Sequence, residues 1–326
     1  DGQYEVRVPW RSLPPSMPNN RHQAFAQLGN LRQRLKKDPK YRREYTQAIS
    51  KYEINGFSEQ VPLDELTPKP GSASWLCHHG VRHERKDLRI VFDASRKFKG
   101  VSLNESIMQG PDLLSSLLGI LLRFRQRRVA VSADISSFFH CVRIPIEDAD
   151  FARYLWFRDG DPDAAIVELR MLCHLFGGIS SQCCSVYAVW RTVDDAVKAG
   201  LITEHEALQV LRDLYSDDLL RSYDTVSEAV RCSLLVKEIL WSSKFKLTKF
   251  ASSHAEVLKD IPGELTSETM KEMQPNDQPK SALGITWDVK RDEFVYGKFP
   301  TDTDVIFTKR GLVSAVMSIY DPLGLL

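Results

Sequence analysis

The stretch Leu211-Arg-Asp-Leu-Tyr215-Ser216-Asp217-Asp218-Leu219-Leu-Arg-Ser-Tyr223 decides the fold that we expect for this chain. Two short apolar segments, Leu211–Tyr215 and Leu219–Tyr223, flank the polar group Ser216-Asp217-Asp218. This pattern is typical of two short strands joined by a tight turn. We therefore expect the two adjacent carboxylates at the tip of a β-hairpin.

A third carboxylate, Asp134, ends the short apolar run Val129–Asp134, which we interpret as a buried strand. If this strand lies beside the hairpin, Asp134 meets Asp217 and Asp218, and the three charges repel one another unless cations lie among them. Such oxygen ligands suit Mg²⁺, and two ions about 3.5–4 Å apart can promote an in-line displacement at a triphosphate. The chain has 43 acidic residues, however, and Asp-Asp pairs also occur by chance, as at Asp194-Asp195.

The sequence predicts that the first 60 residues are mainly helical. Asn20 can cap a helix that runs to about Lys37, and Asp38-Pro39 can begin a second helix that ends near Gly56. Further along, we expect an amphipathic helix from Pro111-Asp112 to about Phe124. The remaining expected elements, by residue number, are strands at 73–79, 88–93, 129–134, to 144, 151–157 and 164–172, a helix at 179–199, a helix at 225–243 that begins with a capping box, a polar connector at 264–280, and a hairpin at 283–288 and 293–298.

The bulk composition is that of a soluble globular protein. The 326 residues are 43% hydrophobic and 27% charged, with a net charge of +1. The longest apolar stretch, Leu113–Leu122, is far too short for a membrane span, so no membrane is expected. The six cysteines form no CxxC pair, which favours reduced thiols in an intracellular compartment.

Basic residues gather in three runs despite the small net charge: 31–43, 82–99 and 121–128. The run at 121–128 contains four arginines and no acidic residue. A single run of this kind is usually a solvated helix face. Three runs within the first 130 residues favour a polyanionic partner such as a nucleic acid.

Several ordered motifs resemble a known family. Tyr215-Ser216-Asp217-Asp218 resembles the Tyr-x-Asp-Asp hairpin of reverse transcriptases, and Ala133-Asp134-Ile135 followed by Phe138-Phe139 resembles their first catalytic motif. The segments that resemble Pao/BEL-type LTR retrotransposon reverse transcriptases are Arg89-Ile-Val-Phe-Asp93-Ala-Ser, Ser102-Leu-Asn104, Gly110-Pro-Asp-Leu, Leu122-Arg-Phe-Arg125, Lys246-Leu-Thr-Lys249-Phe-Ala-Ser, Leu283-Gly284-Ile-Thr-Trp287 and Ile319-Tyr-Asp-Pro-Leu-Gly-Leu. The chain thus resembles the fingers and palm of the pol polyprotein.

The resemblance implies an α+β, right-hand polymerase fold with an antiparallel palm sheet flanked by helices. It implies a basic helical segment at 1–60, fingers at 61–128, a palm with the catalytic carboxylates at 129–263, a polar connector at 264–282, and a palm-end hairpin with the start of the thumb or connection at 283–326. The rest of the thumb and ribonuclease H would be missing. We expect the protease upstream in the polyprotein, and ribonuclease H and integrase downstream.

The resemblance also assigns roles to individual residues. It makes Asp134, Asp217 and Asp218 catalytic carboxylates and places two Mg²⁺ ions, with Mn²⁺ as the alternative, at Asp134, Ile135, Asp217 and Asp218. Arg89, and with less support Lys86, would bind the triphosphate, and Phe139 would exclude a 2′-hydroxyl. Phe176-Gly177 would line the nucleotide pocket, and Leu283-Gly284 would form the primer grip.

The implied function is RNA-directed DNA polymerase, with deoxyribonucleoside triphosphates and an RNA and DNA primer-template as partners. The expected compartment is the cytoplasm, within a virus-like particle, with the nucleus as the alternative. Two alternatives stay open. One is a catalytically weak or decayed nucleic-acid-binding module of the same fold. The other is the Pao retrotransposon peptidase of the same polyprotein, although the sequence contains no Asp-Thr-Gly or Asp-Ser-Gly.

Overall fold

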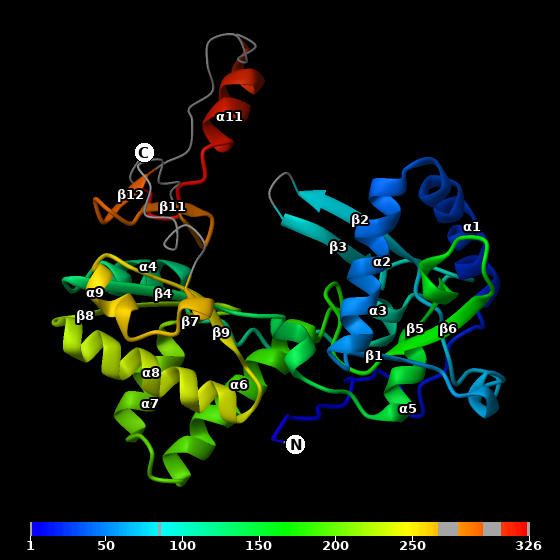
Figure 1. Ribbon diagram of the computed structural model, residues 1–326, viewed down its shortest axis with the longest axis horizontal. Helices are drawn as coiled ribbons and strands as arrows, with labels where there is room; N and C mark the ends of the chain where they lie inside the picture. The colour runs from blue at the N-terminus through cyan, green and yellow to red at the C-terminus, as the bar shows by residue number, and fades with distance from the viewer. Residues whose placement is uncertain (1, 84–85, 267–279, 296–307, 325–326) are drawn as a thin grey trace. The chain divides into compact units, whose positions relative to one another are not determined.

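The computed structural model describes residues 2–83, 86–266, 280–295 and 308–324 (Figure 1). Contacts divide the chain into two units. The first contains Asp1–Leu113 and Ser137–Ala188, and the second contains Leu114–Ser136 and Val189–Leu326. Each unit therefore combines two separate segments of the chain. A division by contacts does not test the functional boundaries named above, which stay predictions.

The first unit opens with two helices, as the capping signals predict. Helix α1 covers Arg21–Lys37 and α2 covers Pro39–Ile54. Asp38 accepts a hydrogen bond from the Tyr41 backbone N–H at 2.8 Å, and Pro39 occupies the first turn, where no N–H is needed. The expected strong N-cap of α2 is confirmed, whereas Asn20 makes no side-chain cap to α1.

Two antiparallel sheets complete the first unit. One has the strand order β1 (Ser58–Gln60), β6 (Ile166–Met171), β5 (Arg153–Phe157), and the other is the hairpin of β2 (His78–His83) and β3 (Lys86–Phe92). Short helical elements join them: η1 (Leu63–Glu65), α3 (Leu103–Ser106), η2 (Phe138–Cys141), α5 (Ile146–Ala149), η3 (Asp150–Ala152) and η4 (Arg158–Gly160). Helix α6 (Ser181–Lys198) begins in this unit and ends in the second.

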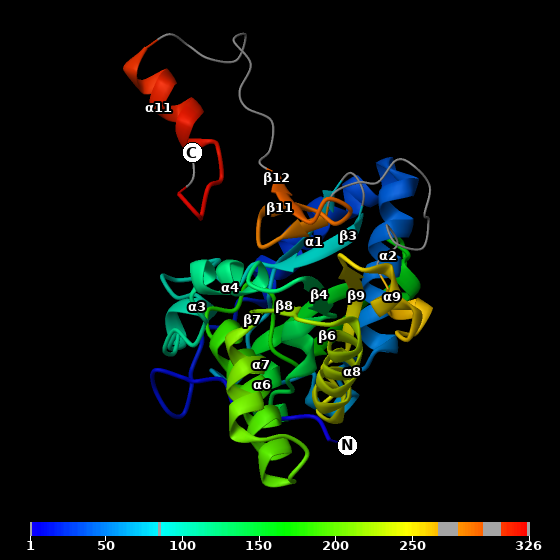
Figure 2. The same cartoon turned by 90° about the vertical axis from the view of Figure 1, so that its left-hand side faces the viewer.

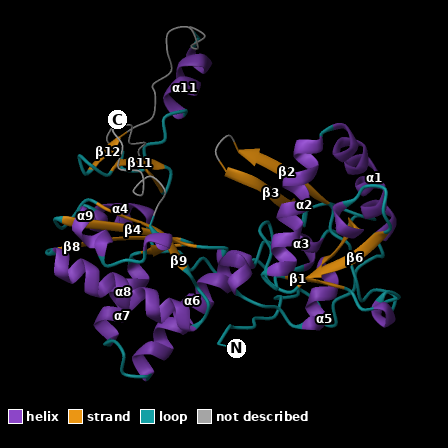
Figure 3. Cartoon of the chain, in the orientation of Figure 1, coloured by secondary structure: helices purple, strands orange, loops and turns teal. Residues whose placement is uncertain are grey.

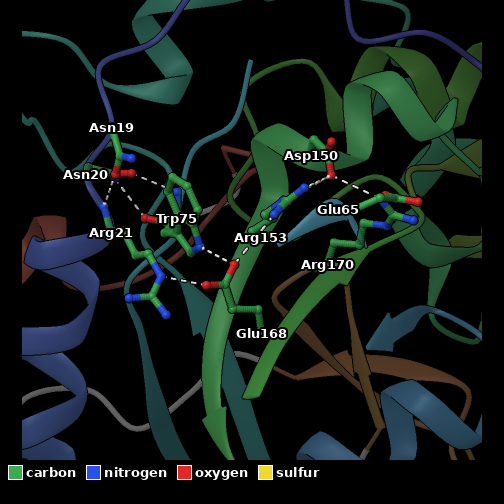
Figure 4. Close-up of polar contacts among 9 residues, drawn as sticks. All are labelled: Asn19, Asn20, Arg21, Glu65, Trp75, Asp150, Arg153, Glu168 and Arg170. Atoms are coloured by element: carbon green, nitrogen blue, oxygen red, sulfur yellow. Dashed lines mark hydrogen bonds and ion pairs between the residues drawn. The ribbon is translucent and has the colours of Figure 1, made fainter. Parts of the chain in front are cut away.

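A buried polar network fixes these strands to the start of α1 (Figure 4). Glu168 on β6, only 5% exposed, accepts hydrogen bonds from Trp75 Nε1 at 2.9 Å and Arg21 Nε at 2.5 Å. The fully buried Arg153 on β5 lies 3.6 Å from the same carboxylate. Removing one partner from such a buried group leaves a charge uncompensated, at a cost of about 3–5 kcal/mol. The network therefore specifies how these segments pack.

The second unit is built on one antiparallel sheet with the order β7 (Leu214–Tyr215), β8 (Asp218–Tyr223), β4 (Val129–Ile135), β9 (Leu247–Ser252). Helix α4 (Leu117–Phe124) lies on one face of this sheet, and α8 (Val226–Ser242) lies on the other (Figures 1 and 2). The remaining elements beside the sheet are α7 (Glu204–Arg212), α9 (Ala255–Lys259) and η5 (Gly263–Leu265).

A small sheet of β10 (Lys280–Ala282), β11 (Ile285–Asp288) and β12 (Glu293–Val295) packs on the α4 side. Trp287 on β11 is fully buried, and its ring centroid lies 4.9 Å from that of Phe124. Helix α11 (Lys309–Met317) follows. No helix in the described part of the chain combines the length and apolarity that crossing a bilayer requires.

The expected α+β class with antiparallel sheets is confirmed, because every pairing between named strands in the described residues is antiparallel (Figure 3). Most expected boundaries differ by only a few residues. The start of the helix expected at Pro111-Asp112 is wrong, since α4 begins after Ser116, whose side chain accepts a hydrogen bond from Gly119 N–H. Aspartate and serine are about equally good N-caps, so the local signal alone does not choose between the two possible helix starts.

Three expected strands are also wrong. The strand expected at 73–79 forms only from His78 onward. In the segment expected as a strand to Ile144, η2 covers 138–141, and Arg143 then makes isolated bridges to Glu5 and Cys173. The first residues of the strand expected at Leu211–Tyr215 belong instead to α7. This helix begins with a capping box formed by Thr203 and Glu206. Most of the polar connector expected at 264–280 lies outside the described residues.

Candidate active site

The sheet of the second unit brings the three predicted carboxylates to one end. Asp134 on β4 is directly opposite Asp218 on β8, so both side chains lie on the same face. Asp217 stands beside them in the turn between β7 and β8, where Ser216 has a φ of 56°. The Ile135 N–H donates to the Asp217 carbonyl at 2.6 Å, which ties the turn to β4. The expectation that the strand and the hairpin lie side by side is confirmed.

The side chain of Lys249, to which the sequence assigned no role in the site, forms an ion pair with Asp134. Between β4 and β9 the register shifts by one residue, because Ser132 pairs with Ala251 whereas Asp134 pairs with Thr248. Lys249 lies within this bulge with a φ of 54°, a conformation that side chains rarely adopt. Its Nζ lies 2.9 Å from Asp134 Oδ1. The bulge thus aims an ammonium group at the carboxylate.

The charges at this site do not fully compensate one another. Burial raises the pKa of the Asp217 carboxyl, and the negative charge of Asp134 raises it further, although Ser216 and Lys249 act in the opposite direction. A raised pKa shows that the ionised form is disfavoured by its surroundings. An added cation would relieve this repulsion.

The donor set fits a hard divalent cation, since it consists of carboxylate oxygens at one end of the sheet. As the side chains lie, however, no three His, Cys, Asp or Glu groups converge to hold an ion within the described ranges. Lys249 already takes one Asp134 oxygen. Binding an ion would therefore require these side chains to rearrange.

The residues expected to bind the nucleotide all belong to the first unit. Arg89 on β3 is exposed, between buried Leu88 and Ile90, and its side chain makes no hydrogen bond or ion pair with the described residues. An unpaired guanidinium of this kind is available to bind a phosphate. The side chain of Lys86 lies outside the described residues, so its expected role stays a prediction.

The two adjacent phenylalanines take different positions, as expected. Phe138 is only 4% exposed, whereas Phe139 is half-buried. They separate because η2 turns the chain, and not because they alternate along a strand as the sequence suggested. The Phe139 ring lies 5.8 Å from the ring of Phe176, which is 52% exposed. The structure thus groups the two aromatic residues assigned to sugar selection and to the nucleotide pocket.

Gly177 and Gly284 occupy positions that only glycine tolerates well. Gly177 has a φ of 99°, and a Cβ there would lie 3.3 Å from the Phe92 carbonyl oxygen. Leu283 and Gly284 have φ values of 51° and 86° and form the turn between β10 and β11. The expected strand at 283 is thus wrong at its start, because the proposed primer-grip pair is a turn.

The basic run at 121–128 is largely neutralised within the second unit. Arg123 Nε lies 3.0 Å from Asp213 Oδ1, Arg125 pairs with Asp292, and Arg127 pairs with Asp224. Arg128 makes no ion pair with the described residues. This run resembles the solvated, paired surface that single basic runs usually form more than it resembles a polyanion-binding stripe.

The other two runs are also partly paired. Arg42 lies 3.0 Å from Asp161, and Lys36 pairs with Asp163. Arg82 Nε lies 2.8 Å from Glu44 Oε2. The argument for a nucleic-acid partner from charge alone is therefore weaker than the sequence suggested.

No family model matches the chain, and no curated protein matches it. Among solved structures, the chain is similar to a Prototype Foamy Virus protease-reverse transcriptase mutant, with 13% identity over 76% of this chain and 27% of that one, at a TM-score of 0.49. It is also similar to the foamy viral protease-reverse transcriptase in complex with an RNA/DNA hybrid, with 15% identity over 75% of this chain and 26% of that one, at a TM-score of 0.44. The chain thus spans under a third of the length of either structure.

Proposed function

We propose that this chain is the fingers and palm of a Pao/BEL-type RNA-directed DNA polymerase that adds deoxyribonucleotides to a primer. The observation that carries the proposal is the pairing of Asp134 with Asp218 across β4 and β8, with Asp217 in the adjoining turn. The sequence resemblance supports the family. The remaining polyprotein segments, with the protease upstream and ribonuclease H and integrase downstream, would be its covalent partners.

In this proposal the ions lie at the carboxylates of the second unit. Asp134, Asp217 and Asp218 would bind two Mg²⁺ ions, which supply charge neutralisation and activation of the primer 3′-hydroxyl when bound. The backbone of Ile135 would stand beside them, because its N–H already anchors the turn that carries Asp217. Lys249 would leave Asp134 as an ion binds.

The nucleotide would meet a cation and two aromatic rings. Arg89 would bind the triphosphate through charge-assisted hydrogen bonds. Phe139 would leave no volume for a 2′-hydroxyl, and Phe176-Gly177 would line the pocket. Leu283-Gly284, in the turn between β10 and β11, would contact the primer end.

Primer extension on an RNA template tests the proposal, with Asp217→Asn as the variant. This change removes one charge and one ion ligand while keeping the size of the side chain. Losing roughly 4 kcal/mol of transition-state stabilisation would slow extension about a thousandfold, with primer-template binding retained. Near wild-type extension by the variant would remove this carboxylate from the mechanism.

Asp194→Asn is the matched control, because it lies in the other Asp-Asp pair of the chain. Within the described part of the chain, the Asp194 side chain makes surface ion pairs alone, with Arg191 at 3.1 Å and Lys198 at 2.7 Å on the same helix. We expect this variant to extend primers at the wild-type rate. A thousandfold loss in both variants would point to general damage and not to lost catalysis.

A second candidate is a nucleic-acid-binding module without catalysis. The ion pair between Lys249 and Asp134 favours it, because an ammonium already neutralises the carboxylate. The two candidates differ in one result. A module of this kind would bind primer-template and extend nothing, at any concentration of Mg²⁺ or Mn²⁺.

A further inference from the structure

The loop at 175–180 displays Phe176 and contains two glycines in crowded places. A Cβ on Gly177 would lie 3.3 Å from Phe92 O, and a Cβ on Gly178 would lie 2.6 Å from Ser181 Oγ. Among the described residues, one backbone hydrogen bond lies within the loop, from Gly178 N–H to Leu175 O at 3.2 Å, and one joins the loop to the start of α6, from Ser181 N–H to Gly178 O at 3.2 Å. Glycine-rich backbone with so few internal bonds needs an external support to keep one conformation.

The side chain of Asn104 supplies that support. Its Nδ2 donates to the Gly177 carbonyl at 3.0 Å, and its Oδ1 accepts from the Ile179 N–H at 2.9 Å. Nδ2 also donates to Ser95 Oγ at 2.9 Å. The amide therefore bonds the loop on both sides of Gly178, and it uses both its donor and its acceptor to do so.

The backbone of Asn104 is itself fixed to the segment that follows β3. Its N–H donates to the Ala94 carbonyl at 2.9 Å, and Ser95 is the next residue. β3 carries Arg89 and ends at Phe92, whose carbonyl faces Gly177. Asn104 thus links the strand of the expected phosphate-binding arginine to the loop of the expected nucleotide pocket.

We propose that Asn104 is the positioning residue of this loop, holding Phe176 and Gly177 in the conformation in which they receive a nucleotide. The statement about the nucleotide rests on the proposed function, whereas the statement about the loop does not. Asn104 touches no reacting atom in this scheme, so its removal should weaken nucleotide binding and not the chemical step.

Asn104→Asp is the test variant, because aspartate has the same shape and keeps the acceptor but loses both donors. Asn20→Asp is the matched control. Asn20 makes the same kind of two-sided contact elsewhere in the unit, with Nδ2 donating to Trp75 O at 2.8 Å and Oδ1 accepting from Trp75 N–H at 2.7 Å (Figure 4). It thus reports what losing such a contact does to folding alone.

Two measurements are made on each variant, after thermal melts have shown how far each is destabilised. The first is amide hydrogen exchange at Gly178, whose N–H bonds within the loop to Leu175 O. Asn104→Asp loses the bond to the Gly177 carbonyl and should speed this exchange at least about tenfold, whereas Asn20→Asp should not. The second is single-nucleotide extension. There Asn104→Asp should raise the KM for the nucleotide about three- to tenfold and change kcat less than about twofold.

The outcomes separate the two claims. Unchanged exchange at Gly178 in Asn104→Asp overturns the positioning role, whatever the enzyme does. A faster exchange with unchanged KM, or an equal rise in KM in Asn20→Asp, overturns the link to the nucleotide. A wild-type protein that extends no primer but shows the exchange difference refutes the proposed function and leaves the loop support established.

Discussion

Lys249→Met should strengthen the binding of a divalent cation at the carboxylates of the second unit. The change removes the ammonium that lies 2.9 Å from Asp134 Oδ1 and keeps an unbranched stem. Methionine would also have to adopt the positive φ of 54°, so the backbone strain of the bulge stays the same. The variant therefore isolates the charge.

The exposure of the pair decides the expected size of the effect. The Lys249 side chain is 61% exposed and that of Asp134 is 23% exposed, so water screens the interaction. Coulomb attraction at this distance in water is about 1.4 kcal/mol, and exposed ion pairs contribute about 0.2–1 kcal/mol net. An ion that must displace the ammonium loses this net contribution of about 0.2–1 kcal/mol, so the affinity for the ion should rise about 1.4- to fivefold when the lysine is absent.

Titration with Mn²⁺, followed by the electron paramagnetic resonance signal of the free ion, measures this affinity without any turnover. Lys244→Met is the control, because Lys244 also has a positive φ, of 67°, but lies over the Trp241 ring and makes no ion pair within the described residues. Equal affinity in wild type and Lys249→Met would refute the reasoning, as would an equal gain in Lys244→Met.

Three further predictions concern sugar selection, nucleic-acid binding and the pH dependence of stability. Phe139→Val should raise ribonucleotide incorporation about ten- to a hundredfold relative to deoxyribonucleotide incorporation in single-nucleotide assays. Phe138 is buried, so Phe138→Val should instead lower the free energy of unfolding by roughly 1–3 kcal/mol. A larger change in sugar selectivity in Phe138→Val would show that the wrong ring was assigned. Primer-template binding should weaken steeply from low to physiological salt with little sequence preference, and a flat salt dependence in a filter-binding assay would count against a nucleic-acid groove. Burial lowers the pKa of His78 and His174 from 6.5 to about 4. The unfolded chain then binds more protons in this window, and the free energy of unfolding should fall by about 1–2 kcal/mol per histidine from pH 7 to pH 5; urea unfolding that is independent of pH would contradict this.

Short-range signals explain most of what could be predicted from the sequence. Asp38 supplies the side-chain N-cap and Pro39 supplies a fixed helical φ, so the start of α2 is determined by a few neighbouring residues. The hairpin at Ser216-Asp217 and the strand before Asp134 follow in the same way from short apolar runs and a polar turn. Expectations failed where two signals competed, as at α4, where Ser116 and not Asp112 caps the helix.

By itself the sequence determined the α+β class, the order of the main helices and strands, and the three carboxylates that the strands could bring together. Only the tertiary structure decided that Asp134 is opposite Asp218, that a bulge places Lys249 on Asp134, and that Asn104 holds the loop of Gly177. The basic runs could be recognised in the sequence. Their acidic partners, such as Asp213 and Asp292, could not, because these residues lie far from the runs along the chain. Local propensity acts over a few residues, whereas strand register, bulges and ion pairs depend on segments that meet only when the chain has folded.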